Sequence, residues 1–207
     1  QERSFILAHG SSTPQNRVTE SLIYHRLAET FDINNWPVAA PKAFVGHTIA
    51  PASGDQITMA LGVFAHNIMP GITTIKSVAD DVYNERLNIA LDHWQCEAMD
   101  VAFINSKGFG GNNATATLLS PNVTSAMIEK RYNIETMTRY KEKLASVEAK
   151  QNVYQEKANN GQFELIYKFG VGVLGDDDIE INSENISMTG FTNPIELPNN
   201  NPFEDMT

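Results

Sequence analysis

The chain has 207 residues and a formal net charge of −10 at pH 7, which argues against nucleic acid, itself a polyanion, as a partner. Its 42% hydrophobic and 19% charged residues are ordinary for a globular protein, and no apolar run reaches the roughly 18 residues that a membrane span needs. The one cysteine, Cys96, excludes an internal disulfide and fits a reducing cytoplasm.

The first 120 residues alternate between strand-like and helical patterns. The clearest helical pattern follows Pro14, where apolar residues recur at spacings of three and four up to Phe31. The expected elements are, in chain order, a strand at 4–8, a helix at 14–31, an extended stretch at 36–45, a buried helix at about 52–68, a short strand at 72–75, and strands at 99–105 and 114–119. This order is an α/β pattern.

The character of the chain changes after Pro121, so we predict one domain over 1–120 and a second over 121–207. The second begins with a helix at 123–132, followed by a long amphipathic helix whose apolar stripe starts at Ile134 and which ends around residues 159–161. Strand-like alternation follows at 163–169 and 179–188, and then a loop-like acidic tail.

Two histidines stand out by their neighbours. His9 follows the first apolar strand and precedes Gly10, and the carboxyl end of a strand is where α/β proteins expose functional groups. His47 follows Gly46, near Lys42. A buried histidine bonded to the backbone is the alternative reading of either one. Structural roles are expected for the other three, His25, His66 and His93.

Lys42 lies in an apolar stretch, where a charge needs a partner, and Glu20 on the first helix is a candidate. A Schiff-base lysine is disfavoured because the sequence has no glycine-rich phosphate cradle for a pyridoxal cofactor. No metal site is expected, because the histidines lack metal-ligand spacing and only one cysteine is present.

Three motifs complete the pattern: His9-Gly10-Ser11-Ser12-Thr13-Pro14, Lys42-x4-His47 and Asn105-Ser106-x-Gly108-Phe109-Gly110-Gly111-x-Asn113. In this order they resemble the C-terminal half of a β-ketoacyl-acyl-carrier-protein synthase. The resemblance implies a thiolase-like layered α/β fold, in which helices pack a mixed sheet, followed by an α+β extension at 121–207. That extension resembles a longer bacterial variety of the synthase.

The resemblance also implies roles for the residues. His9 and His47 would be the two catalytic histidines, which hold the malonyl thioester carbonyl and stabilise the enolate. Lys42 would organise the site and would be held by Glu20.

Three further residues would meet the substrate, again by resemblance. Ser11 and Thr13 would line the phosphopantetheine tunnel, and Phe109 would gate access of the extender unit. No cofactor is implied beyond the phosphopantetheine arm that the substrate protein carries.

The implied reaction is the decarboxylative Claisen condensation of malonyl-acyl-carrier-protein with an acyl thioester, in fatty-acid or polyketide synthesis. Its partners would be the acyl carrier protein, the two thioesters and a missing N-terminal half with the nucleophilic cysteine, in a cytoplasmic homodimer. The chain alone should be inactive, because Cys96 lies beside Glu97 and away from any glycine turn.

The sequence departs from the family pattern at three positions. Lys107 stands where phenylalanine is usual, Arg17 where aspartate is common, and Ser11 where threonine is usual. An acidic carrier would need a basic patch, which Arg17 and Lys107 or the cluster at 130–143 could supply.

Three alternatives stay open on the sequence alone. The chain could belong to a non-catalytic thiolase-like subunit that serves as a dimerisation or chain-length partner. It could belong to a degradative thiolase, although Lys107 and Phe109 stand where a cysteine would be needed. It could also be an interaction module built on 124–160.

Overall fold

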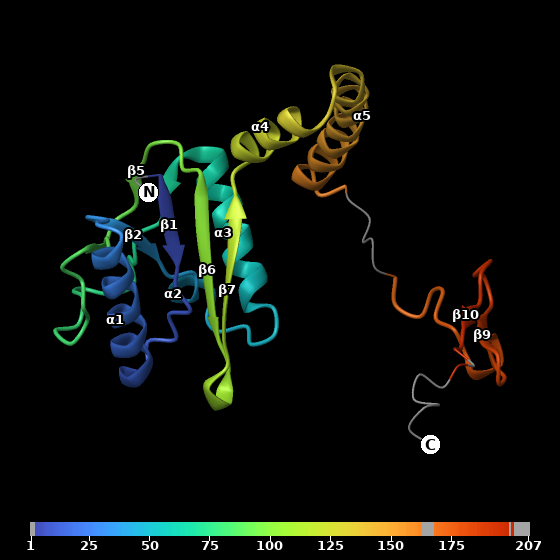
Figure 1. The fold of residues 1–207 in the computed structure, drawn as a ribbon, viewed down its shortest axis with the longest axis horizontal. Coiled ribbons are helices and arrows are strands. Elements are labelled where there is room, and N and C mark those ends of the chain that lie inside the picture. The colour runs from blue at the N-terminus through green and yellow to red at the C-terminus, as the bar shows by residue number, and fades with distance from the viewer. Residues whose placement is uncertain (1–2, 163–167, 199, 201–207) are drawn as a thin grey trace. The chain divides into compact units, whose positions relative to one another are not determined.

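A computed structural model describes residues 3–162, 168–198 and 200 of the chain. The chain divides into two compact units, Gln1–Lys141 and Glu142–Thr207. This boundary lies within a helix, 21 residues beyond the predicted division after residue 120. The predicted division marks a change in sequence character and stays a prediction. Figure 1 shows the course of the chain.

The first unit follows the predicted α/β order. Its elements are β1 (Ser4–Leu7), α1 (Pro14–Thr30), β2 (Trp36–Ala39), α2 (Lys42–Val45), α3 (Ala52–His66), β3 (Ile68–Met69), β4 (Leu87–Asn88), β5 (Trp94–Gln95), β6 (Val101–Lys107), the 3-10 turn η1 (Phe109–Gly111), β7 (Asn113–Leu119) and α4 (Pro121–Arg131). The helix α5 (Ile134–Asn159) begins in this unit and continues into the second.

A five-stranded sheet in the order β4-β2-β1-β6-β7 forms the centre of the first unit. The neighbouring pairs from β4 to β6 are parallel, and β7 runs antiparallel to β6 as the second arm of a hairpin. The mixed sheet expected from the sequence is therefore present. Strands β3 and β5 pair separately.

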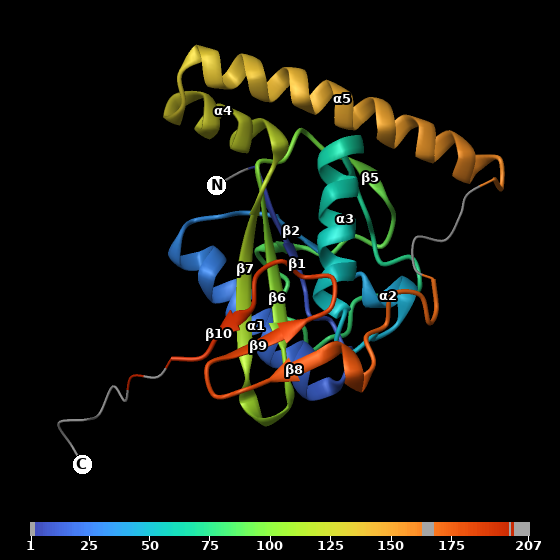
Figure 2. The ribbon, with the colours of Figure 1, turned by 90° about the vertical axis from the view of Figure 1, so that its right-hand side faces the viewer.

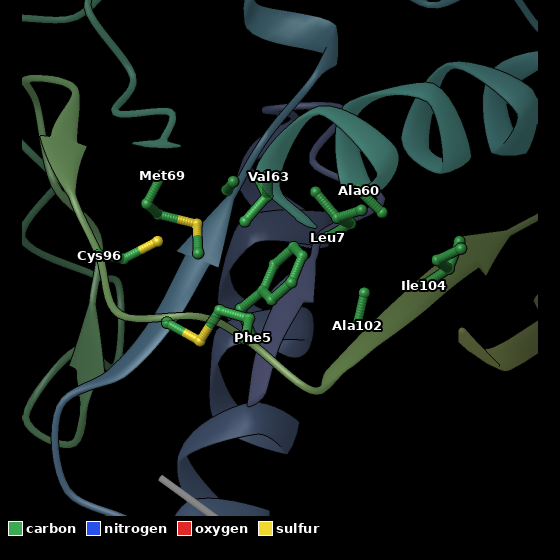
Figure 3. Packing of buried hydrophobic residues seen from close by; sticks show 10 residues of the cluster. Phe5, Leu7, Ala60, Val63, Met69, Cys96, Ala102 and Ile104 are labelled. Carbon is green, nitrogen blue, oxygen red and sulfur yellow. The ribbon is translucent and has the colours of Figure 1, made fainter. Parts of the chain in front are cut away.

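Helices α1 and α3 cover opposite faces of this sheet, as Figures 1 and 2 show together. On one face, Phe5 and Leu7 of β1 pack with Ala60 and Val63 of α3 (Figure 3). On the other face, Ile6 packs in a cluster with residues of α1. Because the strand is buried on both faces, it reads as a continuous apolar run.

Gln56 ties helix α3 to the strand ends that carry the candidate site. Its side chain is 1% exposed, and Nε2 lies 2.9 Å from each of the carbonyl oxygens of Leu7, Ala8 and Asn105. The amide therefore joins the carboxyl ends of β1 and β6 to one helix, and this fixes their relative positions.

Two predicted elements are wrong, the first of them only in part. The stretch 36–45 is extended only to Ala39, because residues 42–45 coil into α2, which ends at Gly46 with φ 74°. The strand expected at 72–75 is instead a turn, in which the Ile75 N–H donates to the Ile72 carbonyl. Of the strand expected at 163–169, residues 163–167 lie outside the described residues, and 168–169 are not a strand.

The second unit contains most of α5, the 3-10 turn η2 (Asp176–Asp178) and a three-stranded antiparallel sheet. Its strands are β8 (Ile179–Ile181), β9 (Asn185–Met188) and β10 (Ile195–Glu196). None of the described residues between 142 and 200 is buried. Across the ranges that the structure describes, no helix combines the length and apolar character needed to cross a membrane.

Candidate active site

His9 lies directly beyond the carboxyl end of β1 and is 6% exposed. The backbone N–H of Lys107, at the end of the adjacent strand β6, donates to its Nδ1 over 3.2 Å. A neutral imidazole whose Nδ1 accepts a hydrogen bond carries its proton on Nε2. His9 is thereby fixed as an Nε2–H donor.

His47 reaches the same tautomer by a local contact. It lies in the exposed loop after α2, and the backbone N–H of Ile49 donates to its Nδ1 over 3.0 Å. Ile49 has φ 65°, a left-handed conformation that costs a β-branched residue free energy. The loop holds a strained backbone that directs this N–H onto the ring.

The structure brings the two imidazoles together. Their ring centroids are 5.2 Å apart and their planes make an angle of 81°. Burial lowers the pKa of His9, and the charge of Lys42 lowers it further, against the opposing effect of Glu20. His9 is therefore neutral at pH 7 and available as a donor.

Glu20 on α1 is 4% exposed and accepts five hydrogen bonds. Burial by itself would raise the pKa of this carboxyl, but the hydrogen bonds outweigh it and the pKa is lowered. The donors are the Tyr24 hydroxyl at 2.5 Å, the His9 N–H at 2.7 Å, the Asn105 amide at 2.8 Å, the Asn16 amide at 2.9 Å and the Gly10 N–H at 3.0 Å.

Lys42 contacts the backbone of His9 rather than Glu20. Its Nζ donates to the His9 carbonyl over 2.6 Å, and within the described ranges no ion pair joins Lys42 to Glu20. Burial lowers the pKa of Lys42, while the charges of Glu20 and Asp55 raise it. Glu20, predicted to hold Lys42, therefore acts on it through its charge and not by direct contact. The N–H of His9 is bound by Glu20, and the carbonyl of His9 is bound by Lys42.

Beside these residues lies an open cavity of about 540 Å³, lined in part by Ser11, Lys42 and His47. Thr13 is exposed, precedes α1 and is not among the lining residues. Phe109 lies at the tip of the β6–β7 hairpin and is 101% exposed, again outside the cavity lining. Of the three predicted substrate contacts, the structure places only Ser11 at the cavity.

Three residues around Glu20 were missed from the sequence. Asn16 and Tyr24 stand four residues before and after Glu20 on α1, so helical spacing could have found them. Asn105 was noted in a motif without a role. Its contact depends on the pairing of β6 with β1, for which the sequence offers no local signal.

The remaining candidates have structural surroundings. His25 lies 3.7 Å from Glu85, and His93 accepts a hydrogen bond from the N–H of Gly71. Cys96 belongs to the core, and burial raises the pKa of its thiol. In the part of the chain that the structure describes, no group of three or more ligand-type side chains could hold a metal ion.

No family model matches the chain. It is 46% identical over 204 residues to the β-ketoacyl-[acyl-carrier-protein] synthase FabY of Pseudomonas aeruginosa. The aligned region covers 98% of the chain and 32% of that protein. The chain is homologous to part of a β-ketoacyl-acyl-carrier-protein synthase. A 3-oxoacyl-[acyl-carrier-protein] synthase 2 of Synechocystis is 28% identical over 123 residues, which make up 54% of the chain and 26% of that protein.

The solved structure of the noncanonical ketosynthase FabY from P. aeruginosa superposes with a TM-score of 0.80 and 44% identity. The match covers 100% of the chain and 32% of that ketosynthase. The predicted thiolase-like ketosynthase fold is therefore confirmed. The chain spans about a third of the length of the synthase, and the remainder of that length has no counterpart among these 207 residues.

Proposed function

We propose that this chain supplies the decarboxylating half-site of a β-ketoacyl-acyl-carrier-protein synthase. The observation that supports the proposal is the pair of imidazoles 5.2 Å apart, each of which has its Nδ1 occupied by a backbone N–H. Both rings consequently offer Nε2–H donors. Two such donors can bind one oxygen on which negative charge develops.

The reaction requires such a pair. When the bond between the malonyl carboxylate and its α carbon breaks, carbon dioxide leaves and the electron pair spreads onto the thioester oxygen as an enolate. The enolate carbon then attacks the acyl thioester, a carbon–carbon bond forms and the thiolate departs. Hydrogen bonds to the enolate oxygen lower the barrier, and the loss of one donor typically costs about 3 kcal/mol.

Lys42 and Glu20 act as positioning residues in this proposal. Glu20 accepts from the N–H of His9, and Lys42 donates to its carbonyl. The two peptide groups on either side of the His9 Cα are thereby each held by a charged side chain. Burial lowers the pKa of His9, and the positive charge of Lys42 lowers it further, since a neighbouring cation disfavours protonation.

The proposal also includes an acylated cysteine, the substrates and the residues that would contact them. The acylated cysteine would come from the missing N-terminal half, because Cys96 is buried in the core. The partners would be malonyl and acyl thioesters on an acyl carrier protein, in a cytoplasmic homodimer without a further cofactor. Ser11 and Thr13 would guide the phosphopantetheine arm, and Phe109, at the exposed tip of the β6–β7 hairpin, would gate access of the extender unit.

The test uses the full-length synthase and malonyl-acyl-carrier-protein. His9→Ala and His47→Ala should each lower the rate of malonyl decarboxylation at least a hundredfold, in line with the loss of an oxyanion donor. His66→Ala, at the end of α3, is the matched control and should retain the rate. Wild-type turnover in either histidine variant refutes the assignment, and a full-length protein without decarboxylation favours the non-catalytic subunit.

A further inference from the structure

His47 lies on an exposed loop, whereas its proposed partner, His9, is buried. The loop runs from Gly46, where α2 ends, to Pro51, which directly precedes α3. The hydrogen bond from the Ile49 N–H to the His47 ring lies within the loop, so it sets the tautomer but does not connect the ring to the rest of the fold. To keep the two rings together, the loop needs a contact with a rigid element.

Asp55, in the first turn of α3, provides such a contact. Its carboxylate accepts a hydrogen bond from the Thr48 hydroxyl over 2.5 Å, and Thr48 directly follows His47. The carboxylate lies near the N-terminus of a helix of 15 residues, where the helix dipole favours a negative charge. Hydrogen bonds to charged groups are stronger than those between neutral groups, so this contact is suited to hold an exposed loop.

Gln56, the next residue of α3, holds the strand that carries the other histidine. Its amide donates to the carbonyl oxygen of Ala8, the residue before His9, over 2.9 Å. Two consecutive residues of one helix thus bind the neighbour of each histidine. The helix itself is rigid, because its buried side chains belong to the core against the sheet. The first turn of α3 therefore connects the backbone segments that carry the two imidazoles.

We propose that Asp55 is a positioning residue for His47, which it holds through Thr48, and that Asp55 and Gln56 together set the separation of the two imidazoles. His47 lines the 540 Å³ cavity, whereas Thr48 and Asp55 lie outside its lining, so Asp55 acts through the loop and not on a bound substrate. The importance of the ring pair rests on the proposed function, but the state of the His47 ring can be measured without turnover.

The first test follows decarboxylation of malonyl-acyl-carrier-protein by the full-length synthase. Thr48→Val removes the hydroxyl donor, and Thr48→Ser keeps it. We expect Thr48→Val to lower kcat about tenfold with KM changed less than about twofold, because a displaced donor weakens binding of the enolate more than binding of the substrate. Thr48→Ser should retain most of the rate.

Thr58→Val is the matched control, because the Thr58 hydroxyl donates to the Gly54 carbonyl on the same helix over 3.0 Å. This variant should keep the wild-type kcat. Where His47→Ala loses the rate, a kcat of Thr48→Val within about twofold of the wild type overturns the proposal. A Thr48→Ser variant as slow as Thr48→Val overturns it as well.

A double-mutant cycle locates the effect at the contact itself. Asp55→Ala removes the acceptor, and the double variant Thr48→Val/Asp55→Ala should be no slower than Asp55→Ala alone. Asp55→Ala is the less selective change, because burial lowers the pKa of Lys42 and the charges of Glu20 and Asp55 oppose this. If the two losses multiply, the residues act independently and the proposal is wrong.

NMR of the synthase with ¹⁵N-labelled histidine separates this proposal from the proposed reaction. The His47 ring should be an Nε2–H tautomer in the wild type and a mixture of tautomers in Thr48→Val, because a looser loop aligns the Ile49 N–H less well. The spectrum of His47→Ala identifies the signal.

The outcomes are distinguishable. If His9→Ala and His47→Ala keep full decarboxylation while Thr48→Val mixes the tautomers, the proposed reaction is refuted and the positioning of His47 stands. If the histidine variants lose activity while Thr48→Val neither slows turnover nor mixes the tautomers, the positioning by Asp55 is refuted and the reaction stands.

Discussion

The two histidines occupy contrasting surroundings that produce the same donor. His9 is 6% exposed, its N–H donates to Glu20, and its carbonyl accepts a hydrogen bond from Lys42. His47 lies in an exposed loop, where one N–H from the strained Ile49 sets its tautomer. The tautomer of a histidine can therefore be fixed within a buried polar cluster or by a strained local backbone. Changes near His9 should cost stability, and changes near His47 should mainly cost activity.

The largest effect is expected from Glu20→Gln on the His9 side. The new amide NH₂ would face N–H and O–H donors that now bind a carboxylate oxygen, and the charge would be lost. We expect the free energy of unfolding to fall by about 3 kcal/mol, measured by urea denaturation. Glu29→Gln is the control, because Glu29 is exposed on the same helix and should change little. A loss as small as that of the control would contradict the importance of the cluster.

Glu20→Gln should also change how the free energy of unfolding depends on pH. The pKa of Glu20 is lowered in the folded protein from its ordinary value of 4.5. Its contribution to stability is therefore complete above about pH 4.5 and is lost as the pH falls through the folded-state pKa. Glu20→Gln should flatten the acid side of the stability curve, as followed by urea denaturation between pH 3 and pH 7. An unchanged acid slope would argue against this role of the carboxyl.

Gly10→Ala should have the next largest effect. Gly10 has φ 56°, and an added Cβ would lie 3.3 Å from the Cβ of Ala40. The left-handed conformation alone costs a non-glycine residue about 1–2 kcal/mol, which we expect as lost stability in urea denaturation. Gly54→Ala on α3 is the matched control, because its Cβ would meet nothing within 4 Å and it should gain up to about 1 kcal/mol. Equal responses of the two glycines would remove the distinction.

On the His47 side, Ile49→Gly should separate stability from activity. Glycine adopts the left-handed conformation without steric cost, so the free energy of unfolding should rise by about 1 kcal/mol. Malonyl decarboxylation by the full-length synthase should fall, because a freer backbone holds the N–H on His47 less firmly. Ile49→Asn, which tolerates this conformation better than isoleucine, should keep more of the rate. A loss of stability in Ile49→Gly would show that Ile49 is not strained.

The smallest effect concerns the proposed carrier docking. Arg17 is paired with Asp81, whereas the Lys107 amine donates to the Thr19 hydroxyl over 3.4 Å and forms no ion pair with any of the residues that the structure describes. Lys107→Glu should therefore weaken carrier binding more than changes at Arg17, by less than about fivefold and less at high salt. Lys150→Glu on α5 is the charge-matched control. If binding and its salt dependence do not change, the docking patch lies elsewhere, for example at 130–143.

Much of the fold could be predicted because long elements carry their own periodicity. The long helix expected to end around residues 159–161 spans Ile134–Asn159, and the helix expected near 14–31 ends one residue earlier. The two-residue strands β3, β4 and β5 were missed, since each exists only through a distant partner, as Leu87 does through Trp36. In the site, the proximity of His9 and His47 was implied by the family resemblance, but the contact of Asn105 with Glu20 required the pairing of β6 with β1.

The hydrogen bonds to the peptide groups on either side of His9 have a consequence for exchange of backbone hydrogens with solvent. The N–H groups of His9 and Gly10 lie outside any regular strand, where amide hydrogens usually exchange within seconds to minutes in D₂O. Both are bound to a carboxylate that is itself 4% exposed. Their deuterium uptake should therefore be as slow as that of strand β1, so this short loop would open only when the sheet does.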